Sequence, residues 1–148
     1  ITESDEILNE KEIMYPLIYG YNLRTLICIL FSKFELAERL CKKLQQKINL
    51  NQDPSYEVQT STYMYIGLMS AGMYRRTKRN KHLRSLRKLN QLFVKFCNTK
   101  GKSCTNRTLI LRAELKSLTT PSRDWRIVKR AYDLAITATT DLGEPFKS

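Results

Sequence analysis

The chain has 148 residues, of which 42% are hydrophobic and 27% are charged, a composition typical of a globular protein and not of a disordered one. Its formal net charge is +12, which favours partners that carry negative charge. This length suits one domain with a sizeable core and no disulfide staples. We expect a single domain over residues 1–148, excerpted from a longer chain, because the sequence begins at Ile1 and stops just after the start of a possible further helix.

The first third of the chain predicts three helices. One covers residues 1–15 and is interrupted by Pro16, and the next covers 17–31. The apolar run from Leu26 to Phe31 predicts that the second of these helices is covered on more than one side. A third helix over 34–48 carries an apolar stripe with Ala37, Cys41 and Leu44 at steps of four and three residues. Residues 49–55 predict a loop.

The middle of the chain predicts two long helices joined by a basic linker. The helix over 56–74 carries Gly67 and Ala71 one turn apart, where a neighbouring backbone can approach closely. A functional glycine hinge is the alternative interpretation. After the linker over 75–80, a helix over 81–97 places Leu83, Leu86 and Phe93 on its inner face.

The end of the chain predicts a helical hairpin. A helix over 107–118 stops before Pro121, which disfavours helix at the residue preceding it. Ser122 is placed to cap the second helix, which runs to about Leu142. The only tryptophan, Trp125, is expected to anchor the packing of this helix.

Small residues recur on the predicted inner faces and allow helices to stack. The residues predicted to pack helices together are Ala37, Gly67, Ala71, Ala113, Ala131, Tyr132 and Ala135. The predicted fold class is therefore all-α, an irregular tetratricopeptide-like stack of antiparallel hairpins with six or seven helices. An ordinary antiparallel bundle uses the same pattern.

Residues 62–143 carry a family resemblance. Their landmarks are the Arg-Ala-Glu-Leu of 112–115 and the Tyr-Asp-x-Ala-Ile of 132–136. This part of the chain resembles the tetratricopeptide-like helical region of large signalling proteins, which follows an AAA- or STAND-type ATPase module and often precedes histidine kinase or cyclase domains. The resemblance implies a region that senses partners for the ATPase switch.

The positive charge is concentrated in one window. Between Arg75 and Arg107 there are twelve lysines and arginines and no acidic residue, whereas the other 14 basic residues are balanced by 14 acidic ones. Within the window, the candidate interaction face consists of Arg75, Arg76, Arg79, Lys81, Arg84, Arg87, Lys88 and Lys95. Its interpretations are a solvated helix face, an acidic protein surface, anionic lipid, or nucleic acid.

The sequence contains no constellation typical of catalysis. His82 is the only histidine and has no cysteine or carboxylate nearby in sequence with which to bind a metal. There is no glycine-rich phosphate loop, and Glu114 is expected to face solvent or to pair with a base on a neighbouring helix. We therefore predict a non-enzyme without cofactor or metal.

The cysteine usage and the apolar runs indicate a cytoplasmic chain that does not span a membrane. Four cysteines form no C-x-x-C pair, so they are expected to be reduced, although Cys97 and Cys104 lie near enough in sequence to form a bridge. No apolar run approaches the roughly 20 residues that a membrane span requires.

The predicted function is a helical-repeat interaction or scaffold module of a multidomain intracellular signalling protein. Its partner would be another protein or a neighbouring domain of the same chain. The alternative is a basic module that binds nucleic acid or anionic membrane through residues 75–107.

Overall fold

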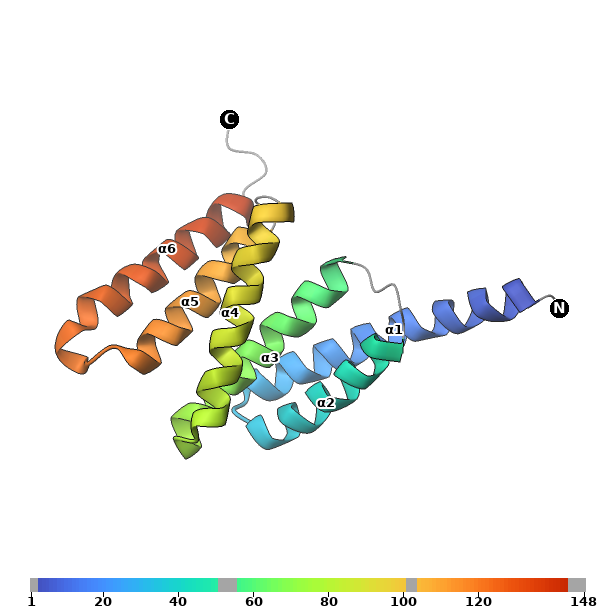
Figure 1. The fold of residues 1–148 in the computed structure, drawn as a ribbon, viewed down its shortest axis with the longest axis horizontal. Coiled ribbons are helices and arrows are strands. Elements are labelled where there is room, and N and C mark those ends of the chain that lie inside the picture. The colour runs from blue at the N-terminus through green and yellow to red at the C-terminus, as the bar shows by residue number, and fades with distance from the viewer. Residues whose placement is uncertain (1–2, 51–55, 101–103, 144–148) are drawn as a thin grey trace. The chain divides into compact units, whose positions relative to one another are not determined.

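The computed structural model of the protein describes the backbone of residues 3–50, 56–100 and 104–143, and side chains within 16–46, 59–95 and 104–140. In these ranges the chain is all-helical, with six α-helices and no strand (Figure 1). The helices are α1 (Glu3–Leu30), α2 (Phe34–Leu50), α3 (Tyr56–Thr77), α4 (Asn80–Lys100), α5 (Thr105–Thr119) and α6 (Trp125–Gly143), with a short 3-10 helix η2 (Ser122–Asp124) before α6. The predicted all-α fold class is confirmed.

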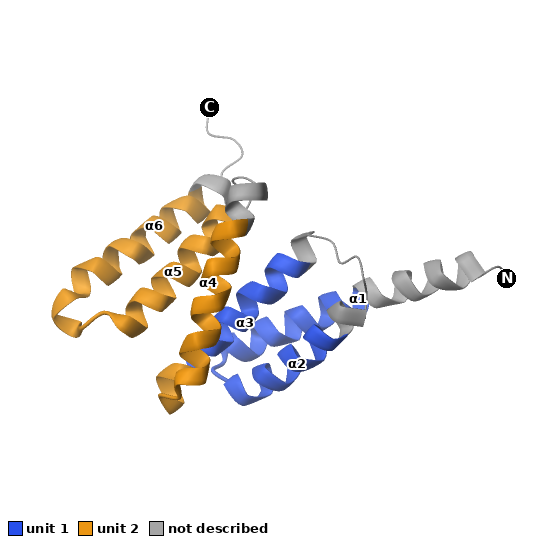
Figure 2. Ribbon diagram, viewed as in Figure 1, with its two compact units in different colours: residues 1–72 blue, residues 73–148 orange. Residues whose placement is uncertain are grey.

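Contacts divide the chain into two compact units, residues 1–72 and 73–148 (Figure 2). The boundary falls within α3, whose last turn belongs to the second unit. The single domain expected from the sequence stays a prediction, and we describe each unit by itself.

The predicted break at Pro16 is wrong, because α1 continues through this residue. Proline removes one hydrogen bond from a helix and crowds the preceding turn, a cost of about 3 kcal/mol that tertiary packing can offset. Within the next nine residues of the helix, Ile18, Asn22 and Thr25 are buried. This packing favours the continuation of the helix.

In the first unit, α1 packs along α2, and Ile18 of α1 and Leu44 of α2 form a fully buried pair against which the partly buried Tyr21 packs. Helix α3 joins them through a buried hydrogen bond of 3.1 Å that the Thr62 hydroxyl donates to the Asn22 side-chain oxygen. This bond satisfies two polar groups that would otherwise be costly to bury.

In the second unit, α5 packs against α4 on one side and against α6 on the other. Phe93 of α4 and Leu111 of α5 are fully buried. On α6 the buried residues are the alanines Ala131 and Ala135, whose small side chains let the two helices approach closely.

The connections follow local chemistry. Ser32 and Lys78 both have φ of 58°, the left-handed conformation that commonly ends helices, and they lie between α1 and α2 and between α3 and α4. Ser122 was predicted to cap the last helix, but it is the first residue of η2, and α6 begins three residues later at Trp125. Pro121 precedes this turn in an extended conformation.

All seven residues predicted to pack helices are at least partly covered. Ala37, Gly67, Ala71, Ala113, Ala131 and Ala135 are buried, and Tyr132 is half-buried. Trp125 is different, because it is 55% exposed and lies near the guanidinium of its neighbour Arg126. The expectation that Trp125 anchors the packing was therefore wrong.

Candidate binding surfaces

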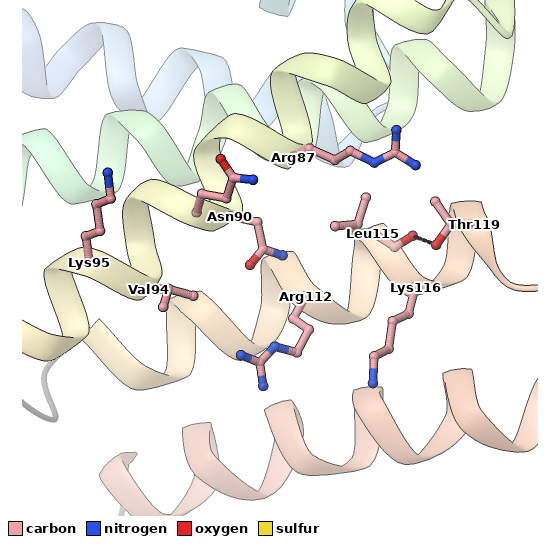
Figure 3. Close-up of a pocket in the computed structure, with 9 residues that line it drawn as sticks. Arg87, Asn90, Val94, Lys95, Arg112, Leu115, Lys116 and Thr119 are labelled. Atoms are coloured by element: carbon pink, nitrogen blue, oxygen red, sulfur yellow. Dashed lines mark hydrogen bonds between the residues drawn. The ribbon is translucent and has the colours of Figure 1, made fainter.

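An open hollow of about 760 Å³ lies between α4 and α5 in the second unit (Figure 3). Helix α4 contributes Arg87, Asn90, Gln91, Val94 and Lys95 to it, and α5 contributes Arg112, Leu115, Lys116 and Thr119. Four of these nine residues are cationic and none is acidic. The hollow is therefore suited to a ligand that carries negative charge.

A smaller hollow of about 320 Å³ lies between α5 and α6 and shares Arg112 and Lys116 with the first. Figure 3 shows both side chains extending from α5 toward α6. Helix α6 adds a fifth cation, Arg130, and the apolar side chains Ile127 and Leu134. We call the two hollows together the basic groove.

The helical register explains why α5 lines the basic groove with cations. Arg112 and Lys116 are four residues apart and so lie on one face of the helix. Glu114 lies on the opposite face, where its carboxylate accepts hydrogen bonds from Arg75 (2.6 Å) and from the Tyr132 hydroxyl (3.0 Å). The one acidic residue of α5 therefore does not neutralise the basic groove.

The other described carboxylates of the second unit are also engaged elsewhere. Asp133 pairs with Lys129 at 2.7 Å, and Asp124 lies 3.8 Å from its neighbour Arg123. None of these acids lines either hollow. Within the side chains that the structure describes, Arg112 and Lys116 consequently make no ion pair.

The ion pair of Glu114 ties the last turn of α3 to α5 and α6. The Glu114 side chain is only 16% exposed, whereas that of Arg75 is 45% exposed. Arg75 also donates a hydrogen bond to the Ser117 hydroxyl at 2.8 Å. Glu114 therefore has a structural partner on a neighbouring helix, one of the two arrangements expected from the sequence.

Replacing Glu114 by glutamine should lower the free energy of unfolding by about 1–2 kcal/mol, because a charge-assisted hydrogen bond becomes a neutral one in a half-buried site. Urea denaturation of the variant and the parent measures this difference. Lys129→Gln is a matched control, since its pair with Asp133 is exposed and should contribute less than about 0.5 kcal/mol. Equal effects of the two substitutions would contradict a structural role for Glu114.

Burial, together with the Glu114 carboxylate, raises the pKa of Tyr132 above its ordinary value. A tyrosine with a raised pKa in the folded state contributes stability that is complete below its unfolded pKa of about 10 and is lost as pH rises through the folded pKa. At neutral pH the hydroxyl therefore remains protonated and keeps donating to Glu114.

The basic groove overlaps only partly with the basic face predicted from the sequence. Arg87 and Lys95 line it, whereas Arg75 is held by Glu114. The remaining predicted residues are exposed but line neither hollow: Arg76, Arg79, Lys81, Arg84 and Lys88. The three cations that the sequence reasoning missed are Arg112, Lys116 and Arg130. Arg112 and Lys116 could have been found from their four-residue spacing, which places both on one face of a helix.

A second candidate surface lies in the first unit, on the outer face of α1. The large apolar side chains of this face, including Phe31 directly after the helix, are between 46% and 73% exposed: Tyr19, Leu23, Ile27, Leu30 and Phe31. They lie opposite the buried residues Ile18, Asn22 and Thr25 of the same helix. A β-carbon added at Gly20, beside this face, would meet no atom within 4 Å. The outer face of α1 is therefore apolar and uncovered by the described residues.

Cys41 is buried, and its environment favours the protonated thiol over the thiolate. Burial, with a smaller contribution from Glu38, raises the pKa of Cys41 to about 12. Cys28 is only half-buried. We expect a maleimide at pH 8 to label Cys28 much faster than Cys41, because only the thiolate is nucleophilic. Peptide mapping by mass spectrometry measures both rates, and equal labelling of the folded protein would contradict this packing.

The side chain of Cys97, and with it the possible bridge to Cys104, lies outside the described residues.

Among the described residues, no group of three or more His, Cys, Asp or Glu side chains is arranged to hold a metal ion. No helix in the described ranges combines the length and hydropathy needed to cross a bilayer. The chain matches no family model, no curated protein and no solved structure. The candidate surfaces are therefore interpreted from their own chemistry.

Proposed function

We propose that the chain is a non-catalytic helical module that binds other proteins. The observation that carries this proposal is the outer face of α1, where four large apolar side chains of the helix, and Phe31 directly after it, are left substantially exposed. Contiguous exposed apolar surface of this kind is characteristic of protein interfaces. The small Gly20 beside the face gives a partner helix room to approach.

The charge distribution around α1 favours a protein partner over a membrane. Helices that lie on anionic membranes combine an apolar face with flanking lysines and arginines. Helix α1 contains two cations, Lys11 and Arg24, against five acidic residues. The concentrated positive charge of the chain lies instead between Arg75 and Arg107, in the other unit.

The wider assignment rests on the resemblance of residues 62–143 to helical regions of large ATPase-containing signalling proteins. In this proposal the chain is a cytoplasmic scaffold, and its partner is another protein or a neighbouring domain of the same polypeptide. Stacked helical hairpins suit that role because their extended surfaces hold partners without chemistry of their own.

The test compares Leu23→Ser/Ile27→Ser with Arg24→Ser, a control that changes a charged residue of the same helix and leaves its apolar side chains in place. Each tagged chain is expressed in its native cells, and captured proteins are quantified by mass spectrometry after nuclease treatment. The apolar-face variant should lose its enriched proteins while the control keeps them, and both should remain folded by circular dichroism. An identical set of captured proteins for the two variants, or a set that nuclease removes, would overturn the proposal.

A further inference from the structure

We propose that the basic groove binds an acidic protein segment in which carboxylates alternate with aliphatic side chains. This inference rests on the proposed role in binding proteins and names the chemistry of one partner. It concerns the second unit alone, and it does not involve the outer face of α1.

The charge of the basic groove is the first argument. Five cations from three helices line the two hollows, and no carboxylate does. The described acids of the unit are engaged elsewhere, with Glu114 held by Arg75 and Asp133 held by Lys129. Among these cations, Arg112 and Lys116 pair with none of the described carboxylates. A partner that supplies carboxylates would therefore find charge that is not already neutralised, which favours both association and a defined register.

The apolar lining is the second argument. Val94 and Leu115 lie among the cations of the larger hollow, and Leu109, Ile127 and Leu134 lie among those of the smaller one. Phosphates and sugars gain nothing from such surface, whereas leucine or valine side chains of a bound segment would bury it. The ligand that fits has acidic and aliphatic residues close together.

The lining also distinguishes a protein segment from a nucleic acid or a membrane. Sequence-tolerant binding of single strands relies on aromatic side chains that stack on bases, and no aromatic residue lines either hollow. A lipid surface is broad and flat, whereas these cations surround hollows of about 760 and 320 Å³. Such volumes suit a few side chains of one extended segment. Gln91 and Thr119, which line the larger hollow, offer polar groups to its backbone.

The experiment uses the full 148-residue chain and four fluorescent probes: a short peptide of alternating Glu and Leu, a peptide of Glu alone, a DNA single strand, and phosphatidylserine vesicles. Binding is measured at about 0.15 M salt, where charges farther apart than about 8 Å are largely screened. The groove variant is Arg112→Glu/Lys116→Glu. The matched control is Arg84→Glu/Lys88→Glu, which has the same charge change and spacing on exposed positions outside the hollows.

The expected result is that the Glu/Leu peptide binds more tightly than the Glu peptide. The groove variant should weaken its binding by at least about tenfold, and the control by less than about twofold. A second variant, Arg87→Glu/Arg130→Glu, changes cations on the other two helices and should also weaken binding. Circular dichroism checks whether each variant is folded. If one of these two variants does not fold, the binding of the other decides the outcome.

Three results would overturn the proposal. Equal weakening by the groove and control variants would indicate only the general positive field of the chain. Tighter binding of DNA or of vesicles than of the Glu/Leu peptide would favour the nucleic-acid or membrane alternative. No peptide binding by the folded parent would reject an acidic segment as the ligand. The Leu23→Ser/Ile27→Ser variant keeps the basic groove intact, so failure here leaves the α1 proposal to be judged by its own test.

Discussion

Replacing Phe93 by alanine should lower the free energy of unfolding by about 3–5 kcal/mol, among the largest effects of any single substitution in this chain. Phe93 is fully buried in α4, in the unit where α5 packs on that helix. Removing the ring forfeits its burial and leaves a cavity that the surrounding helices fill only in part. Urea denaturation followed by circular dichroism measures the loss.

Val94→Ala is the matched control for Phe93→Ala. Val94 is the next residue of the same helix, but it is 37% exposed and lines the basic groove. Its truncation should cost less than about 1 kcal/mol. Equal losses of stability would mean that Phe93 is not more deeply buried than Val94. The face of α4 that packs in this unit, and with it the position of the basic groove, would then be wrong.

The helices could be predicted because their signals are local. The apolar spacing of α4 placed Leu83, Leu86 and Phe93 on one face, and all three are buried. Pro121 marked the break between the last two helices, and α5 ends at Thr119. Pro16 misled the same reasoning, because a proline weakens a helix but does not decide its end when the residues after it, beginning with Ile18, are packed.

The basic groove could be predicted only in part because it is assembled from residues distant in sequence. A count along the chain finds the window from Arg75 to Arg107, where charge is dense. In the fold, Arg75 is paired with Glu114 and so does not line the basic groove, whereas Arg112 and Lys116, which lie outside the window, do line it. Which cations share a surface depends on which helix faces are adjacent, and no local rule contains that information.

The glycines are a second case in which the fold, and not the local sequence, identifies the sensitive position. Gly67 is the glycine that the sequence predicted to pack helices, and it is buried. At Gly72, for which the sequence made no such prediction, the space for a side chain is already occupied. A β-carbon built at Gly72 would overlap the ring of Phe34 at the start of α2. This contact lies within the first unit and joins two residues that are far apart in sequence, so only the fold reveals it.

We therefore expect Gly72→Ala and Gly20→Ala to change stability in opposite directions. Both glycines lie inside helices, where alanine is favoured by about 0.5–1 kcal/mol. At Gly20 the added carbon meets nothing, so that gain should appear in full. At Gly72 the ring of Phe34 must move, and overpacking should outweigh the gain for a net loss of about 1–3 kcal/mol.

A double-mutant cycle isolates the contact behind this loss. In a Phe34→Leu background the aromatic ring is gone. Gly72→Ala should then cost little or stabilise the protein, as we expect for Gly20→Ala. Urea denaturation of the four chains gives the coupling free energy between the two positions. A Gly72→Ala variant as stable as Gly20→Ala in the parent background, or a loss that persists without the Phe34 ring, would show that α3 does not approach α2 at this point. The packing described for the first unit, which positions the outer face of α1, would then be wrong.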